Sequence, residues 1–245
     1  MTNSKPTLYL VATPVGNLED MTYRAVRVLS EVSEIFAEDT RVSRVLLERY
    51  GIATHLTSYR EAAPRGMVER TITDVLSRLK AGESVAYISD AGTPAVSDPG
   101  SYLVKRVVEA GYAVSPIPGA SALPMIISVS GMQVTQPLFV GFLPRKKGKQ
   151  TLLKRLREAL VSETADAVIF YESPERIVSL LEYLGEWELP LELCIGRELT
   201  KKFEDIFHGN LSEMQGVFSD KGKQRGEFVV LVALTAGREA KDSLE

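Results

Sequence analysis

Short apolar runs alternate with helical patterns along this chain, and this alternation is what most constrains its fold. Runs at residues 8–12, 34–37, 85–88 and 113–116 have the length of buried strands. The segments between them place apolar residues three and four apart, as in Val68, Ile72, Val75 and Leu79. This order of elements predicts an α/β fold with a parallel sheet covered by helices.

The pattern starts again near residues 133–137. Further apolar runs follow at residues 138–142, 167–171, 191–196 and 227–234. A chain of 245 residues is long enough for two domains of ordinary size. We therefore expect an N-terminal α/β domain over residues 1–135, with a mainly parallel sheet, and a C-terminal α/β domain over residues 136–245.

The stretch 85–100, VAYISDAGTPAVSDPG, reads as a strand that breaks into a loop of small, turn-forming residues. Asp98 is expected to cap the next helix, with Pro99 at its first position. In an open α/β sheet, ligands bind outside the carboxyl ends of the strands. A ligand loop and a plain strand-to-helix connection both fit this stretch.

Similar loops end four other predicted strands, at residues 13–17, 118–122, 142–144 and 171–174. Five such loops, spread over both halves, suggest a cleft between two domains that binds a small molecule. The chain has neither G-x-G-x-x-G nor G-x-x-x-x-G-K-[ST], so the dinucleotide and P-loop fingerprints are absent.

Composition narrows the possible partners. The net charge of −3 gives no global case for nucleic acid, so a polyanion must meet a local patch. The single cysteine, Cys194, allows no internal disulfide, and the two histidines have no metal-ligand neighbours, so no metal site is expected. With no apolar signal region and no run of about 18 apolar residues, we expect a cytoplasmic protein with no membrane partner.

Eight segments together are more specific than any one of them. In order they are LYLVATPVGNLEDMTYRA, AEDTR, ISDAGTPAVSDPG, PIPGASA, GFLP, FYESPERI, GRELTKKFE and GEFVVLV. Over roughly residues 7–235 they resemble the tetrapyrrole-methylase-like (class III) S-adenosylmethionine-dependent methyltransferases. The DAGTP and YESP segments are similar to the branch that acts on small-subunit ribosomal RNA. The tetrapyrrole enzymes carry Gly-Asp-Pro where this chain has Gly92-Thr93-Pro94.

The resemblance implies two α/β domains with S-adenosyl-L-methionine in the cleft between them, and a homodimer. It implies 2′-O-methylation of a cytidine ribose in the decoding region of 16S ribosomal RNA, either free or in the assembled small subunit. The cofactor contacts that it implies fall on Pro14, Val15, Asp90, Ala91, Gly92, Thr93, Val96, Ser121, Ala122, Tyr171, Glu172, Glu198, Leu199 and Gly226.

The chain departs from this branch in two places. Members usually carry a segment with histidine and asparagine after the third strand, where this chain has Ser58 to Ala63, reading SYREAA. Relatives also generally continue for several tens of residues as a small helical tail, whereas this sequence stops at Glu245. Both departures concern substrate binding more than cofactor binding.

Methyl transfer from a sulfonium needs in-line placement of the acceptor and exclusion of water. A ribose hydroxyl is a weak nucleophile, so a general base would assist the transfer. Asp39 is the first candidate and Glu172 the second, because both follow predicted strand ends; Arg41 is a candidate for binding a substrate phosphate. Purely structural roles stay open, with Asp39 as the cap of a helix from Thr40 and Arg41 as its ion-pair partner.

The best basic cluster is Arg145, Lys146, Lys147 and Lys149. Such a loop supplies salt-dependent phosphate contacts that carry no sequence information, although a solvated basic loop is the plain alternative. Two other functions also remain open: a methyltransferase of the same fold for a small, tetrapyrrole-like molecule, and a non-catalytic RNA-binding relative.

Overall fold

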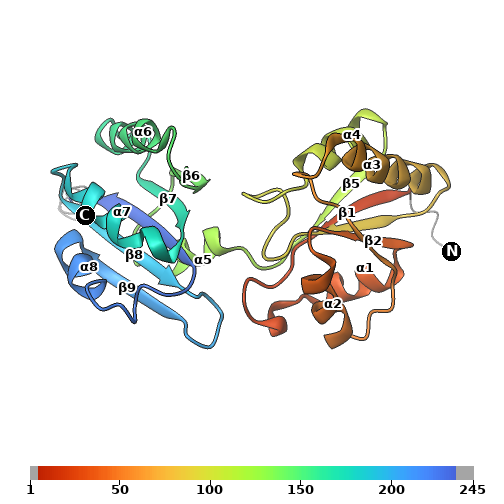
Figure 1. Cartoon of the computed structure of the whole chain (residues 1–245), viewed down its shortest axis with the longest axis horizontal. Coiled ribbons are helices and arrows are strands. Elements are labelled where there is room, and N and C mark those ends of the chain that lie inside the picture. The colour runs from red at the N-terminus through yellow and green to blue at the C-terminus, as the bar shows by residue number, and fades with distance from the viewer. Residues whose placement is uncertain (1–4, 236–245) are drawn as a thin grey trace, which may run out of the picture. The chain divides into compact units, whose positions relative to one another are not determined.

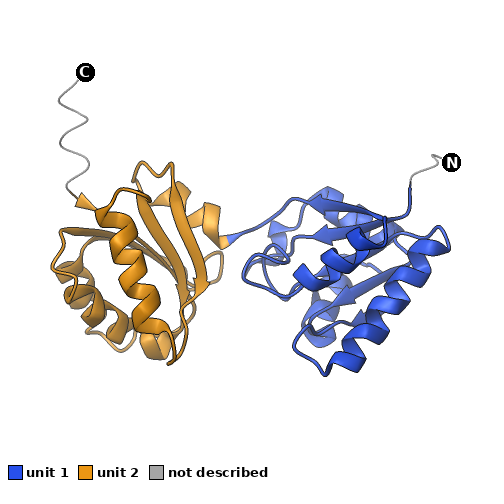
Figure 2. Ribbon diagram, turned by 90° about the horizontal axis from the view of Figure 1, so that it is seen from above, with its two compact units in different colours: residues 1–121 blue, residues 122–245 orange. Residues whose placement is uncertain are grey.

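The computed structural model describes residues 5–235 and divides the chain into two compact units, residues 1–121 and 122–245 (Figure 2). The division falls earlier than the expected position near residue 135. The reason is helix α5 (Ala122–Val129), whose Ile126 is buried against Ile169 and Leu231 of the second sheet. The charged tail at residues 237–245, expected from the sequence to fray, lies outside the described residues.

The first unit is built on a five-stranded sheet in the order β3-β2-β4-β1-β5. Its strands are β1 (Thr7–Val11), β2 (Glu34–Ala37), β3 (Leu56–Ser58), β4 (Val85–Ile88) and β5 (Ala113–Ile117). Every neighbouring pair is parallel, which agrees with the sheet expected from the alternating pattern. The carboxyl ends of all five strands therefore lie at one end of this sheet.

Helices cover both faces of the first sheet (Figure 1). One face packs against α1 (Tyr23–Glu31) and α2 (Thr40–Arg49), through side chains such as Val28 and Leu47. The other packs against α3 (Arg65–Lys80) and α4 (Ser101–Glu109), whose Ile72 and Leu103 join a cluster with Tyr87. A short 3₁₀ turn, η1 (Leu18–Asp20), precedes α1.

The expected helix cap at Asp98 is wrong. Helix α4 begins at Ser101, and its N-cap is Gly100, which has no side-chain cap. The N–H of Gly100 instead donates to Oε2 of Glu61, at 2.5 Å. Gly100 has a φ of 125°, and a Cβ there would lie 2.7 Å from the ring of Tyr87. The position therefore requires glycine, and its N–H is bound by a carboxylate distant in sequence rather than by a local side chain.

The second unit holds a mixed five-stranded sheet in the order β6-β7-β10-β8-β9. Its strands are β6 (Pro137–Phe142), β7 (Ala167–Glu172), β8 (Leu191–Arg197), β9 (Asp205–Asn210) and β10 (Phe228–Leu234). Only the β6–β7 pair is parallel, and the other three pairs are antiparallel.

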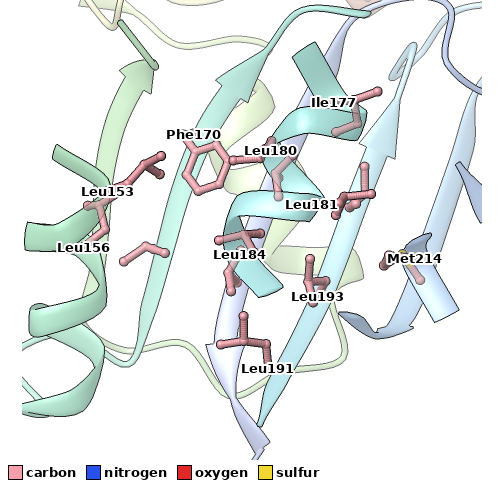
Figure 3. Packing of buried hydrophobic residues seen from close by; sticks show 14 of the residues in the cluster. Leu153, Leu156, Phe170, Ile177, Leu180, Leu181, Leu184, Leu191, Leu193 and Met214 are labelled. Carbon is pink, nitrogen blue, oxygen red and sulfur yellow. The ribbon is translucent and has the colours of Figure 1, made fainter. Parts of the chain in front are cut away.

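One face of this sheet carries α6 (Lys149–Val161), α7 (Ile177–Gly185) and α8 (Leu211–Val217). Leucines of α6 and α7 surround Phe170 in this core (Figure 3). Helix α5 lies on the opposite face, and a 3₁₀ turn, η2 (Pro174–Arg176), joins β7 to α7. Within residues 5–235, no helix combines the length and apolar character needed to cross a membrane.

Candidate functional site

Loops from three strands meet at the carboxyl end of the first sheet. Thr13 and Gly92 exchange backbone hydrogen bonds of 2.9 and 3.1 Å, which join the loops after β1 and β4. The hydroxyl of Thr93 donates to the carbonyl of Ala120 at 3.1 Å, which ties in the loop after β5. These contacts gather the residues of the first unit that the resemblance assigns to the cofactor, namely Pro14, Val15, Asp90, Ala91, Gly92, Thr93, Val96 and Ser121.

Small residues are required at this end of the sheet. A Cβ on Gly119 would lie 2.9 Å from the Cβ of Ala12. Gly92 has a φ of 77°, and its Cβ position would be 3.8 Å from Cγ2 of Val15. Ala91 and Gly119 are exposed, so the peptide groups beside them are open to a ligand. The loops thus fit a ligand that is recognised by backbone N–H and C=O groups.

A second group of predicted cofactor residues meets at one end of the second sheet. Phe228 pairs with Glu172 on one side and with Arg197 on the other, which brings Tyr171 and Glu198 to the same end of the sheet. Oε1 of Glu198 accepts from the N–H of Glu227 at 2.8 Å.

Gly226 completes this group, because a Cβ on it would lie 2.4 Å from Cγ of Glu198. Leu199 is buried, and Ala122, the first residue of α5, packs against the same hydrophobic cluster. The structure thus brings the predicted cofactor residues of the second unit together.

Asp39 and Arg41 adopt the arrangement of the purely structural alternative. Asp39 is the N-cap of α2 and accepts from the N–H of Arg41 at 2.9 Å. The guanidinium of Arg41 donates to both carboxylate oxygens, at 3.0 and 2.5 Å. These hydrogen bonds, from the side chain first and the backbone second, hold the pKa of Asp39 far below its usual range. A carboxylate of this kind is a weak proton acceptor near neutral pH.

Two other carboxyl groups in the first unit have a pKa that is raised rather than lowered. Burial, followed by the charges of Glu38 and Asp90, raises the pKa of Asp98 to about 6. Burial and the charge of Asp90 also raise the pKa of Glu38. The SDPG pattern predicts only a helix cap at Asp98, and no sequence pattern singles out Glu38. The sequence alone does not show that Glu38 and Asp98 are close, because their closeness depends on β2 and β4 being neighbours in the sheet.

Residues 58–63, where this chain differs from the related branch, contact neighbouring parts of the first unit. Nε of Arg60 donates to the carbonyl of Glu38 at 3.3 Å. The rings of Tyr59 and Tyr87 pack edge to face, with centroids 5.4 Å apart. Together with the bond from Glu61 to Gly100, these contacts tie the segment after β3 to the loops that follow β2 and β4.

Glu172 lies inside the second unit. Its side chain is 0% exposed, and Oε1 forms an ion pair of 2.5 Å with Nη2 of Arg176 and accepts from the N–H of Ser173 at 2.8 Å. Oε2 is buried and has no hydrogen-bond partner among residues 5–235. In this conformation the carboxylate has no path to a substrate hydroxyl, so the geometry favours a positioning role for Glu172.

The predicted RNA-binding cations lie at the start of α6. Arg145, Lys146 and Lys147 are exposed, and Lys149 is the first residue of the helix. Within the described part of the chain, none of these four side chains forms an ion pair within 4.0 Å, although Arg145 is close enough to Glu175 to contribute to the lowered pKa of that carboxyl. Their charges are therefore largely available to a polyanion.

Comparison with known proteins gives consistent matches. The model of the tetrapyrrole (corrin/porphyrin) methylases matches residues 7–215. A protein of Borrelia garinii subsp. bavariensis, named ribosomal RNA small subunit methyltransferase I, is 44% identical over 92% of this chain and 98% of its own length. The protein of that name from Halalkalibacterium halodurans is 42% identical over 94% of this chain and 76% of its own length.

The fold is shared with solved structures. The uroporphyrin-III-C-methyltransferase of Thermus thermophilus is 17% identical and superposes with a TM-score of 0.59, over 97% of this chain and 96% of that one. The α/β, tetrapyrrole-methylase-like fold expected from the sequence is thereby confirmed. The chain belongs to the tetrapyrrole (corrin/porphyrin) methylase family and is an S-adenosylmethionine-dependent methyltransferase.

Proposed function

We propose that this protein methylates ribosomal RNA of the small subunit, at the 2′-oxygen of a cytidine ribose in the decoding region. The observation that carries the proposal is a set of relatives named ribosomal RNA small subunit methyltransferase I, which are 40–44% identical over 92% or more of this chain. The 2′-oxygen and the decoding region are added from the resemblance of the sequence motifs. The exposed cations at the start of α6 supply the local positive charge that an RNA substrate needs on a protein of net charge −3.

S-adenosylmethionine, when bound, supplies a methyl group already activated on a sulfonium. The loops after β1, β4 and β5, and the group formed by Tyr171, Glu198, Leu199 and Gly226, are the proposed binding surfaces. In the loops of the first unit, backbone N–H and C=O groups beside small residues are the proposed contacts to S-adenosylmethionine. Because these loops are fixed in the fold, their geometry orients the ligand. Orientation is the main requirement, because the acceptor oxygen must lie in line with the sulfur–methyl bond.

The acceptor side of the reaction needs a proton sink. The ribose oxygen forms the new bond to the methyl group, the electrons of the broken bond stay on sulfur, and the hydroxyl proton passes to a carboxylate. The pKa directions favour Asp98 and Glu38 over Asp39 as this acceptor. Glu172 is better suited to positioning Arg176, which in turn binds the backbone carbonyl of Leu143 after β6.

Substrate phosphates are the proposed partners of Arg145, Lys146, Lys147 and Lys149. Arg41 keeps an exposed side chain after pairing with Asp39, and its Nη1 is proposed for a further phosphate. Such contacts orient an RNA strand without reading its sequence. A cytoplasmic location and a homodimer complete the proposal, and sedimentation of the purified protein tests the second of these.

The deciding experiment maps ribose methylation on ribosomal RNA from a strain that lacks this protein. One cytidine of the small subunit should lose its 2′-O-methyl group and regain it on complementation. In parallel, the purified protein should transfer labelled methyl groups to small subunits from that strain and not to porphyrinogens. An unchanged methylation map, or transfer to the porphyrinogens alone, would refute the proposal.

A further inference from the structure

Phe142, the last residue of β6, is an aromatic side chain on the surface of the second unit. It is 59% exposed, although a ring of this size is normally at least half buried. Among the described strands, β6 lies at the edge of its sheet and pairs only with β7. Within the described residues, the other phenylalanine with comparable exposure is Phe203, at 65%, in the turn between β8 and β9.

A β-bulge places the ring of Phe142 on its present face. Phe139 pairs with Ile169 and Phe142 pairs with Tyr171, so three steps along β6 match two along β7. Gly141 absorbs the extra residue with a φ of 64°. Because side chains alternate along a strand, Phe142 would otherwise point to the face opposite Phe139. Bulges of this kind re-aim a side chain.

The bulge gives Phe142 a supporting partner. The rings of Phe139 and Phe142 each pack edge-on against Tyr171, with centroids 5.2 Å apart in both pairs. Tyr171 thus supports Phe142 from one side, while more than half of the surface of Phe142 remains exposed. An aromatic ring that is held in place and open to solvent loses little conformational entropy when a flat ligand stacks on it.

The backbone directly after Phe142 is also fixed. Leu143 is buried, and its carbonyl accepts from Nη1 of Arg176 at 3.1 Å. Arg176 is held in turn by the buried Glu172. The cations begin at Arg145, three residues beyond Phe142, which corresponds to at most about 10 Å of extended chain. One strand of RNA is long enough to meet both the ring and the cations.

We propose that Phe142 is a stacking platform for an unpaired base of the RNA substrate. The inference rests on the proposed function and adds a recognition element to it. Proteins bind single-stranded RNA by combining cations for the phosphates with aromatic faces for the bases. Because every base has such a face, Phe142 contributes affinity and orientation rather than base choice. The adjacent positive charge favours RNA over a second copy of this chain, which would bring the same charge.

The test compares three variants with the wild-type protein, using small ribosomal subunits from a strain lacking the protein as the binding partner. Phe142→Ala removes the ring, Phe142→Trp keeps a stacking surface, and Phe203→Ala is the control with matched exposure. We expect Phe142→Ala to weaken subunit binding about tenfold, in line with the loss of one stacked base. Phe142→Trp and Phe203→Ala should bind within about twofold of wild type.

The Phe142→Trp variant gives a direct optical readout. The natural tryptophan, Trp187, is buried, so a tryptophan at position 142 adds a distinct exposed fluorophore. Its emission should be quenched when subunits bind, whereas that of the wild-type protein should change little. S-adenosylmethionine affinity should match wild type in all three variants, and Phe142→Ala should lower the midpoint of thermal unfolding only by the loss of the ring contact with Tyr171.

Several results would overturn the inference. They are equal subunit binding by Phe142→Ala and Phe203→Ala, an unquenched tryptophan in the bound complex, or a dimer that dissociates when the ring is removed. A loss of S-adenosylmethionine affinity as large as the loss of subunit binding would assign Phe142 to supporting Tyr171 instead. Failure of the proposed function is distinguishable, because the wild-type protein itself would then neither bind nor methylate the subunits.

Discussion

Arg176 holds the carboxylate of Glu172 at 2.5 Å inside the second unit, where the Glu172 side chain is 0% exposed. The same guanidinium donates to Ser173 at 2.9 Å and to the carbonyl of Leu143 at 3.1 Å. One cation therefore neutralises a buried acid at the end of β7 and fixes the backbone at the end of β6. The Tyr-Glu-Ser-Pro-Glu-Arg segment joins two strand ends through this contact.

Replacing Arg176 with an uncharged residue should destabilise the protein. Removing one partner of a buried ion pair leaves an uncompensated charge. Because Arg176 is partly exposed, we expect Arg176→Met to lower the free energy of unfolding by about 2–3 kcal/mol, measured by urea denaturation. The double variant Glu172→Gln/Arg176→Met removes both charges and should recover part of this loss. A single variant as stable as the wild type would contradict the positioning role.

The sequence predicted the architecture well because hydrophobic periodicity is a local signal. The runs that became β1, β2, β4 and β5 were visible as apolar segments, and the alternation with helices required a parallel sheet. Strand β9 (Asp205–Asn210) was missed, because its half-buried residues form no apolar run. Its place in the sheet comes from pairing with β8, which local pattern does not encode.

The site was predicted less completely because its energetics are set by contacts distant in sequence. Asp98 has the SDPG context of a helix cap, yet α4 begins after Gly100, whose N–H is bound by Glu61 from 39 positions away. Glu172 looks like an exposed acid until Arg176 and the burial of β7 are known. The resemblance of the sequence motifs predicted both groups of cofactor residues, whereas the protonation tendency of each carboxyl depends on neighbours that only the fold reveals.

The proton acceptor should be visible in the pH dependence of methyl transfer. An acceptor must be deprotonated, so a carboxyl with a pKa of about 6, such as Asp98, makes kcat/KM rise with pH up to about 6 and level off above it. We expect Asp98→Asn to remove this acid limb and to lower the plateau by about 100-fold. Initial rates on small subunits from pH 4.5 to 9 measure both effects.

Asp39→Asn is the matched comparison for this experiment. Asparagine also caps helices, so α2 should remain intact. Because the pKa of Asp39 lies far below its usual range, its loss should leave the acid limb in place and lower the rate by less than about tenfold. If Asp39→Asn abolishes the limb and Asp98→Asn preserves it, Asp39 is the acceptor and the assignment to Asp98 fails.

Gly226 tests the cofactor group of the second unit. With a φ of 97° and a Cβ position 2.4 Å from Cγ of Glu198, alanine at residue 226 must displace the Glu198 side chain. We expect Gly226→Ala to raise the dissociation constant for S-adenosylmethionine about tenfold by calorimetry. Gly216→Ala, where a Cβ meets nothing within 4 Å, should bind as wild type. If Gly226→Ala and Gly216→Ala bind S-adenosylmethionine equally well, the residues around Gly226 make no cofactor contact.

Reversing the charge of the loop before α6 should separate RNA binding from cofactor binding. The triple variant Arg145→Glu/Lys146→Glu/Lys147→Glu replaces three exposed cations that form no ion pair within the described residues. We expect weaker binding to small subunits, and a plot of log affinity against log salt that is shallower by about 2, because each lost single-strand phosphate contact removes about 0.7. S-adenosylmethionine affinity should not change.

The control variant must carry the same change in net charge elsewhere. Arg27→Glu/Lys80→Glu/Lys105→Glu reverses three charges on helices α1, α3 and α4 of the first unit. If RNA binding depended only on net charge, both triple variants would lose affinity equally. If the loop before α6 makes the contacts, only the first variant loses affinity and salt dependence. Unchanged affinity and slope in both variants would place the phosphate contacts outside this loop.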